Sequence, residues 1–241
     1  MDRLIHQDRP KQPEPDRVIR LLVVDDDPLV RAGLRLMLSA ADDIDVVAEA
    51  SDGADVQSLV DQFRPDLVLM DIRMPRMDGL AATAALRQRP EPPEVLILTT
   101  FTTDNYVLQA LRAGAAGYVL KHTPPAQIVA AVHNVMAGEP VLSPAAIRQL
   151  IDTVTGTDSA AGAGSSRIEE RERAEAALNQ LGAREREVAL AVAEGRTNAE
   201  IAAACYMSLP TVKAHVSHIL TKLGLNNRVQ IALLVYRAGR V

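Results

Sequence analysis

The sequence predicts an α/β protein with a doubly wound five-stranded parallel sheet, followed by a small all-α helix-turn-helix domain. Three observations favour this fold class. Apolar runs alternate five times with amphipathic stretches up to residue 138, a Gly- and Ser-rich segment follows at 155–167, and the chain from Leu181 onward has helical periodicity. Because strand–helix–strand crossovers are right-handed, the repeated alternation places helices on both faces of one parallel sheet.

The elements of the first domain follow one another with short connections. Buried strands are expected at 18–24, 44–50, 66–70, 94–99 and 116–120. Helices are expected at 28–40, 53–63, 78–88, 104–114 and 124–138. The charged, Pro-rich residues 1–17 are expected to be a disordered tail, so the first domain spans 18–138.

The chain changes character after residue 138. A helix is expected at 143–152, and the small, polar residues 155–167 have the composition of a flexible linker. Residues 168–180 are charged and helix-prone, with no expected role beyond spacing the domains. We assign 139–178 to a partly helical linker.

The second domain then spans 179–241. Helices are expected at 183–195, 197–206, 208–225 and 227–239, two of them joined by a tight turn. Four short helices in this arrangement indicate a helix-turn-helix bundle. Cys205 lies just before the turn, where a small buried side chain is expected to have a structural rather than a redox role.

Composition and charge indicate two domains with different partners. The 241 residues are 48% hydrophobic but only 2% aromatic, so the cores must be aliphatic, which suits parallel strands covered by helices. Residues 181–241 contain eight Lys/Arg and four Asp/Glu, a net charge of +4. Since the whole chain has a net charge of −5, residues 1–180 have a net charge of −9. The basic second domain is therefore a candidate for binding nucleic acid, with chance variation as the alternative on charge alone.

The sequence predicts a cytoplasmic protein. Its single cysteine cannot form an intramolecular disulfide, which fits a reducing compartment. No signal peptide and no run of about 18 apolar residues occurs, so no membrane partner is expected.

Carboxylates gather where the expected strands end. In the commonest five-strand order, 2-1-3-4-5, a ligand site lies at the carboxyl ends of the first and third strands. The residues at the strand ends are Asp25, Asp26 and Asp27 after the first strand, Asp71 after the third, Thr99 after the fourth and Lys121 after the fifth. Asp27 precedes Pro28 and is expected to be a helix N-cap.

This cluster favours metal-assisted phosphoryl chemistry. Several unpaired carboxylates repel one another unless a cation lies among them, and Mg²⁺ is the expected hard cation with oxygen ligands. One carboxylate can then act as the nucleophile toward a phosphoryl donor, while the metal and Lys121 neutralise the charge on the transferred group.

Four segments in this domain resemble a known family. LLVVDDDP, LVLMDIRMPRMDGL, VLILTTF and GYVLK stand in the order and spacing of the flavodoxin-like receiver domains of response regulators, over about 18–138. The resemblance implies that Asp71 is the phosphoacceptor and that Asp25 and Asp26 hold Mg²⁺ with it. The backbone carbonyl of Arg73 would complete the protein ligands.

The same resemblance assigns the residues that respond to the phosphate. Lys121 would pair with the phosphate, Thr99 would move to hydrogen-bond it, and Tyr118 would rotate inward when Thr99 moves. The chain departs from the family after the lysine. His122 stands where many receivers have proline, so the loop around Lys121 need not follow their geometry.

The second domain carries an independent resemblance. LGAREREVALAVAEGRTNAEIA, TVKAHV and KLGLNNRVQIA resemble the LuxR-type helix-turn-helix of NarL/FixJ response regulators over about 179–241. The resemblance implies a recognition helix at about Leu209–Leu223 with Lys213, Ala214 and Ser217 toward the bases. Its candidates for phosphate contacts are Arg196, Thr197, Asn198, Thr211, Lys222 and Arg228.

Together the two resemblances imply a DNA-binding transcription regulator and not an enzyme. A sensor histidine kinase would phosphorylate Asp71, and the activated protein would form a homodimer through the last helix, 227–237, on double-stranded promoter DNA. In this family the unphosphorylated receiver often masks the recognition helix.

Two alternatives remain at this point. One is a phosphorylation-independent transcription factor whose receiver is only an interaction module. The other is an Asp-nucleophile phosphatase of the haloacid-dehalogenase type. Those enzymes place two Asp residues after the first strand, whereas the isolated acceptor here follows the third strand.

Overall fold

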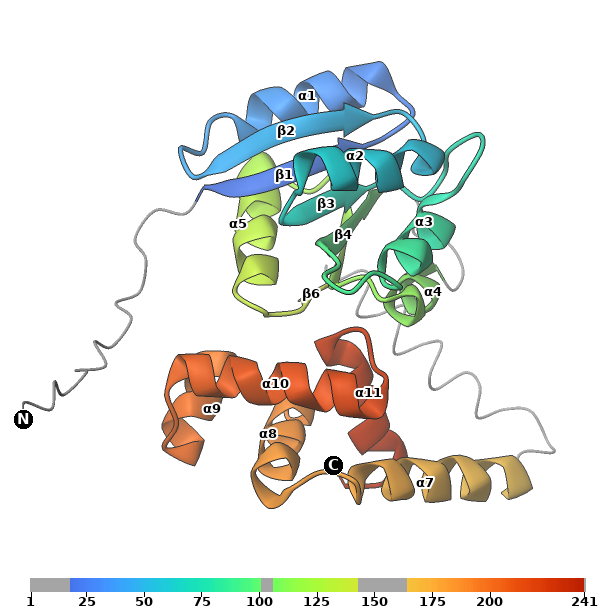
Figure 1. Ribbon diagram of the computed structural model, residues 1–241, viewed down its shortest axis with the longest axis vertical. Helices are drawn as coiled ribbons and strands as arrows, with labels where there is room; N and C mark the ends of the chain where they lie inside the picture. The colour runs from blue at the N-terminus through green and yellow to red at the C-terminus, as the bar shows by residue number, and fades with distance from the viewer. Residues whose placement is uncertain (1–17, 101–105, 143–163, 241) are drawn as a thin grey trace, which may run out of the picture.

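The computed structural model describes residues 18–100, 106–142 and 164–240 (Figure 1). The described residues up to 142 form a parallel sheet covered by helices, and residues 164–240 form a helical domain that lies below it in Figure 1. The expected tail at 1–17 and the expected helix at 143–152 fall outside the described residues. No helix in the described part of the chain is long and apolar enough to cross a membrane.

The sheet confirms the doubly wound prediction and adds a strand. Its strands are β1 (Ile19–Val24), β2 (Ile44–Ala50), β3 (Leu67–Met70), β4 (Glu94–Thr99), β5 (Gly117–Leu120) and β6 (Val141–Leu142). The order is β2-β1-β3-β4-β5-β6, and every neighbouring pair is parallel. β6, which was not expected, pairs only two residues with β5, too few to produce a periodic sequence pattern.

Helices cover both faces of the sheet. They are α1 (Pro28–Leu38), the 3-10 turn η1 (Gly53–Asp55), α2 (Val56–Phe63), α3 (Gly79–Leu86), α4 (Tyr106–Ala113) and α5 (Pro125–Met136). Side chains alternate along β1, so that Leu22 packs with α2, α3 and α4 on one face and Leu21 packs with α1 and α5 on the other. The expected N-cap is confirmed, since the Asp27 carboxylate accepts a hydrogen bond from Leu29 N at 2.8 Å.

The C-terminal domain contains one more helix in its core than the expected helix-turn-helix bundle. Its helices are α7 (Gly164–Leu178), α8 (Ala183–Ala193), α9 (Asn198–Cys205), α10 (Leu209–Leu223) and α11 (Arg228–Arg237). α7 begins inside the segment expected to be linker, and its Ala174 and Leu178 are buried in the same core as Ile219 and Ile231. The helix-prone segment without an expected role thus helps to form this core.

Capping residues define the helix-turn-helix. Thr197 and Glu200 form a reciprocal capping box at the start of α9, and Ser208 caps α10. Tyr206 ends α9 in the left-handed region, with a φ of 54°, and its side chain is exposed. Cys205 is buried in the core, in agreement with the structural role expected for it.

Candidate functional site

The carboxylate cluster forms where β1 and β3 end side by side. Val24 and Met70 are paired in register, so Asp25 and Asp71, the next residues, leave the sheet at the same edge. Both side chains are buried, whereas Asp26 is exposed. One oxygen from each of the three carboxylates lies within 4.8 Å of the others. The structure therefore brings together the three acidic side chains that the sequence placed here.

Lys121 closes the cluster from the other side of β4. Its Nζ lies 2.6 Å from an Asp25 oxygen and 2.8 Å from an Asp71 oxygen. Its backbone N–H donates to the carbonyl of Thr99 at 2.8 Å, which fixes the ends of β4 and β5 relative to each other. The ammonium group thus bridges the two buried carboxylates despite the His122 departure from the family pattern.

Burial and pairing shift the pKa values of this cluster in a consistent way. Burial raises the pKa of Asp25, although the hydrogen bond from Lys121 opposes it. Burial alone would lower the pKa of Lys121, but its hydrogen bonds to Asp25 and Asp71 outweigh that effect and raise it. Lys121 therefore stays protonated at neutral pH and serves as a fixed positive charge.

The loop after β3 holds Asp71 in place. Ile72 N donates to an Asp71 oxygen at 2.7 Å, and Asp78 caps α3 by accepting a hydrogen bond from Ala81 N at 2.7 Å. A Cβ added at Gly79 would lie 2.0 Å from the backbone oxygen of Asp71. Only glycine permits this close approach, which explains the Asp-Gly pair seven residues after the acceptor.

Asp52 also holds this loop in place, a role that no sequence motif indicated. Its buried carboxylate accepts hydrogen bonds from Arg76 N at 2.8 Å and Met77 N at 3.1 Å, as well as from Ala54 N at 2.9 Å. Gly53 N donates to the Met77 carbonyl at 3.3 Å. These bonds outweigh the effect of burial and lower the pKa of Asp52. The brace depends on backbone groups 24 and 25 residues away, which no local motif records.

The remaining receiver residues from the sequence lie around the cluster. Thr99 is completely buried at the end of β4, and Arg73 is exposed in the loop that follows Asp71. Tyr118 is already buried on β5, where burial raises the pKa of its hydroxyl. Tyr118 therefore lies in the packed core between the sheet and its helices in this structure.

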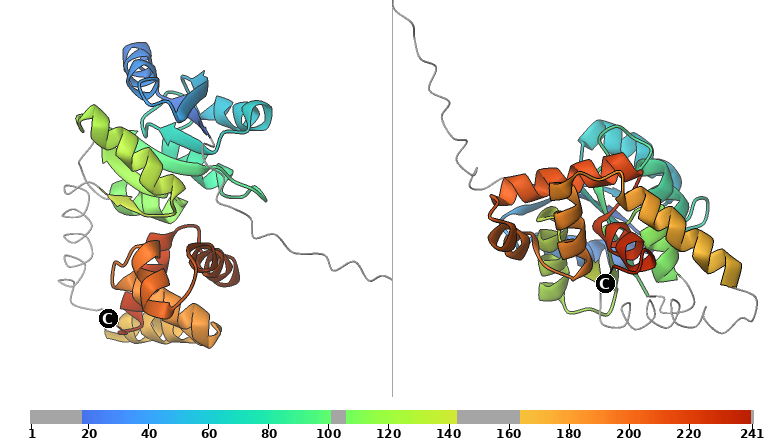
Figure 2. Two further views of the ribbon diagram at one scale, coloured as in Figure 1. Left: turned by 90° about the vertical axis from the view of Figure 1, so that its left-hand side faces the viewer. Right: turned by 90° about the horizontal axis from the view of Figure 1, so that it is seen from below.

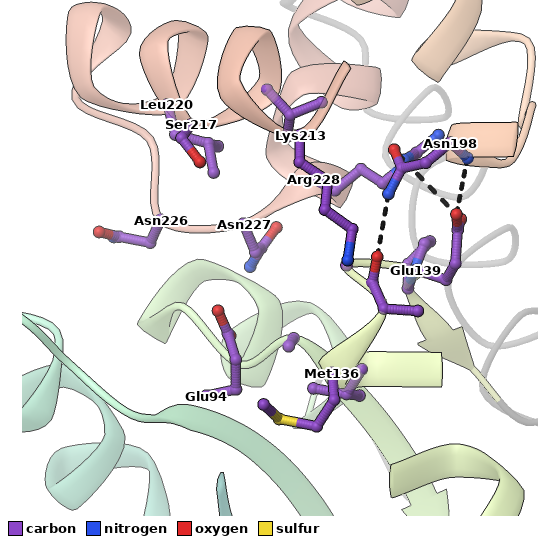
Figure 3. Close-up of a pocket in the computed structure, with 16 residues that line it drawn as sticks. Glu94, Met136, Glu139, Asn198, Lys213, Ser217, Leu220, Asn226, Asn227 and Arg228 are labelled. Atoms are coloured by element: carbon purple, nitrogen blue, oxygen red, sulfur yellow. Dashed lines mark hydrogen bonds and ion pairs between the residues drawn. The ribbon is translucent and has the colours of Figure 1, made fainter. Parts of the chain in front are cut away.

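The expected recognition helix is α10, and its outer face turns toward the receiver. Lys213 and Ser217 line a cavity of about 320 Å³ whose opposite wall includes Met136, Glu139 and Glu94 (Figure 3). A B-DNA major groove is about 12 Å wide and requires free access to the helix. The receiver therefore lies next to the face of α10 that the sequence assigned to base contacts (Figure 1).

The phosphate-contact candidates divide into two groups. Exposed positions are occupied by Arg196, Thr197, Thr211 and Lys222, as well as by Ala214 on α10. Lys222 pairs with Glu185 at 2.9 Å. Asn198 and Arg228 are instead 3% and 7% exposed, because they lie at the contact with the receiver. The structure thus places two of the candidates in the domain interface.

A second contact joins α11 to the end of α4. Asn227 Nδ2 donates to the carbonyls of Leu111 and Ala115 at 2.7 and 2.9 Å, while Asn227 Oδ1 caps α11 by accepting from Gln230 N at 2.9 Å. Gln230 Nε2 also donates to the Leu111 carbonyl at 2.7 Å. Val229 packs into the receiver core beside α4. The N-terminal turn of α11, expected to be part of a dimer surface, is therefore covered by the receiver here.

Comparison with known protein families assigns both domains. Residues 21–133 match the model of the response regulator receiver domain, and residues 179–235 match that of the bacterial regulatory proteins of the luxR family. The chain belongs to the response regulators. More narrowly, it is a response regulator with a LuxR-type DNA-binding domain, and this family consists of transcription regulators rather than enzymes.

Similar proteins share this two-domain organisation. The response regulator is 36% identical over 222 residues to the transcriptional regulatory protein LiaR of Bacillus subtilis, covering 91% of this chain and 98% of that one. It is 36% identical over 217 residues to the nitrate/nitrite response regulator protein NarL of Escherichia coli, covering 90% and 94%. The response regulator ChrA, whose crystal structure is known, is 35% identical in sequence. Its structure matches this one with a TM-score of 0.50, over 93% of this chain and all of that one.

These findings settle the class of protein and leave the roles of single residues as predictions. The fold class and the family that were expected from the sequence are confirmed. Because the family consists of transcription factors and not enzymes, the phosphatase alternative is wrong.

Proposed function

We propose that Asp71 of this response regulator accepts a phosphoryl group from a sensor histidine kinase, and that this switches on binding to double-stranded promoter DNA. The observation that carries the proposal is the pairing of Lys121 with both Asp25 and Asp71 inside an acidic cluster. In the transfer, an Asp71 oxygen bonds to phosphorus while the bond from phosphorus to the histidine nitrogen breaks, and its electron pair stays on nitrogen.

The donor set of the cluster fits a divalent cation. Among the described residues, Lys121 pairs with two of these three carboxylates, so one ammonium group balances only part of their charge. Carboxylate oxygens are the ligands that Mg²⁺ prefers. Asp25, Asp26 and Asp71 would hold the ion, and Arg73 would add a backbone carbonyl. When bound, Mg²⁺ would neutralise charge on the transferred phosphoryl oxygens.

The switch residues then respond to the new charge. Lys121 leaves the Asp71 carboxylate and pairs with the phosphoryl oxygens, and the Thr99 hydroxyl moves to hydrogen-bond them. In the sequence, β4 is connected to α4 by residues 101–105, and α4 is the helix that contacts Asn227. A shift of Thr99 at the end of β4 is therefore proposed to reach α4 and weaken this contact. Inward rotation of Tyr118 remains a prediction of the family resemblance.

Opening of the domains must precede binding to DNA. Lys213 and Ser217 face the receiver, and Val229 of the expected dimer helix packs against it. Release frees α10 for the bases and α11 for a second copy of the chain in the same step. Phosphorylation and dimerisation are thereby coupled through one interface.

Light scattering tests the proposed function. With Mg²⁺ and beryllofluoride, a phosphoryl mimic, the molar mass of the wild type should change from monomer to dimer, while Asp71→Asn stays monomeric. An unchanged wild-type mass, or an equal change in Asp71→Asn, would favour the phosphorylation-independent alternative.

A further inference from the structure

A carboxylate on the receiver side of the interface contacts the start of α9 and an arginine of α11. Glu139, in the turn between α5 and β6, accepts a hydrogen bond from Asn198 N, the first residue of α9, at 2.6 Å (Figure 3). Its second oxygen lies 3.7 Å from Arg228 Nη1. Asn198 Nδ2 donates to the Ala137 carbonyl at 3.1 Å, so the α5 end and the α9 start are held together.

The site is built around a buried guanidinium group. Arg228 is 7% exposed and donates to the Asn198 side-chain oxygen at 2.6 Å and to the carbonyl of Arg196. These two acceptors are neutral, and Glu139 is the carboxylate that pairs with Arg228 within the described residues. Removing a buried charge from its partner costs free energy, so Arg228 requires an anion whenever its surroundings stay dry.

The same groups have the chemistry of a phosphate site. A backbone N–H at a helix N-terminus and an arginine together favour an oxyanion, and phosphate oxygens bind such pairs in many proteins. Two side chains from the phosphate-contact candidates, Asn198 and Arg228, meet here, and a third candidate, Arg196, contributes its backbone carbonyl. Glu139 is the receiver's contribution to this cluster.

We propose that Glu139 stands in for a phosphate of the DNA backbone and keeps this site occupied until the domains separate. The inference rests on the proposed function, and it goes beyond masking of the recognition helix. It names one anion site for which the receiver and the DNA compete. Charge competition and steric masking make different predictions, because only the first depends on the charge of Glu139.

A substitution that changes only the charge of Glu139 distinguishes charge competition from steric masking. Glu139→Gln keeps an oxygen that can accept from Asn198 N but removes the negative charge. The probe is a duplex of 24 base pairs enriched from a random pool by the beryllofluoride-treated wild type, with binding measured by fluorescence anisotropy on the full chain. Glu91→Gln is the matched control, because Glu91 is an exposed receiver carboxylate that lines a different surface hollow, beside Arg64 and Arg89.

Without beryllofluoride, Glu139→Gln should bind the duplex about tenfold more tightly than the wild type, as expected for loss of one charge-assisted contact. With beryllofluoride, the two should agree within about twofold, since the receiver no longer covers the site. In an Arg228→Ala background the gain from Glu139→Gln should disappear. Glu91→Gln should behave as the wild type in both states.

The outcomes distinguish this inference from the proposed function. If the beryllofluoride-treated wild type enriches no duplex, the proposed function fails. If it does, but Glu139→Gln binds no more tightly than the wild type, the anion site is not contested by Glu139. A gain that persists in the Arg228→Ala background would also overturn the inference.

Discussion

The phosphoacceptor edge and the domain interface use polar groups in opposite ways. At the edge, the carboxylates are fixed by groups of the receiver itself, as when Ile72 N holds Asp71 and Arg76 N holds Asp52. At the interface, the polar contacts join the two domains, as with Asn227 on α4 and Glu139 on α9, and in the proposed function they break before DNA binds. In the left view of Figure 2 the receiver lies above the C-terminal domain, with the interface between them.

The difference shows how one molecule can receive and transmit a signal. A chemical site needs preorganised side chains, so its hydrogen bonds belong to rigid loops within one domain. A switch needs two states close in free energy, so its contacts are few and reversible. Substitutions at the two regions should therefore have separable effects.

The largest effect is expected from Asn227→Asp. Aspartate keeps the oxygen that caps α11 but replaces the amide donor with a charged oxygen facing the Leu111 and Ala115 carbonyls. Loss of the two bonds and burial of the charge should shift the domain equilibrium by about 2–3 kcal/mol toward the open state. Small-angle X-ray scattering without beryllofluoride should show a larger radius of gyration than for the wild type. An unchanged radius would show that this contact does not hold the domains together.

A smaller effect, on the phosphoacceptor site and not on the domain interface, is expected from Asp52→Asn. Loosening the brace on residues 76–77 should weaken Mg²⁺-dependent binding of beryllofluoride about tenfold, as loss of a supporting contact does at metal sites. The radius of gyration without beryllofluoride should stay at the wild-type value. If Asp52→Asn opened the domains instead, the separation between the two regions would be wrong.

The same substitution carries a pH signature. The folded-state pKa of Asp52 is lowered, so its carboxylate stabilises the fold above its unfolded pKa of about 4, and this stabilisation is lost as the pH falls through the lower folded value. Asp52→Asn should thus melt below the wild type at pH 7, and the gap should narrow as the pH falls below about 4. A gap that stayed constant with pH would contradict the role of the charge.

The smallest effect is expected from salt. The pair of Glu139 with Arg228 is partly exposed on the Glu139 side, so raising NaCl from about 0.05 to 0.5 M should weaken the closed state by less than about 1 kcal/mol. The neutral Asn227 contacts should not respond. Scattering of the wild type and of Glu139→Gln across this range checks the point, because the variant should have lost most of the salt dependence.

The two regions also differ in how far the sequence predicts them. Asp25, Asp71 and Lys121 follow three strands of one parallel sheet, and parallel strands bring their carboxyl ends to one edge, so the cluster could be predicted. The Asp52 brace could not, because it contacts backbone N–H groups that carry no side-chain signature.

Nothing in a single sequence tells which surfaces of two domains meet. Asn198 and Arg228 fitted the pattern of phosphate contacts, yet the structure buries both beside Glu139. β6 and the packing of α7 were also missed, the first because it is two residues long and the second because a charged helix buries only a few alanine and leucine side chains.

Amide hydrogen exchange of the full chain, with Mg²⁺ and with or without beryllofluoride, tests most directly whether Asp71 controls the interface. Exchange should be faster at residues 111–116, 137–142 and 226–230 when beryllofluoride is bound to the wild type, and should not change in Asp71→Asn. Unchanged exchange at all three segments in the wild type, despite binding of beryllofluoride, would contradict control of the interface by Asp71.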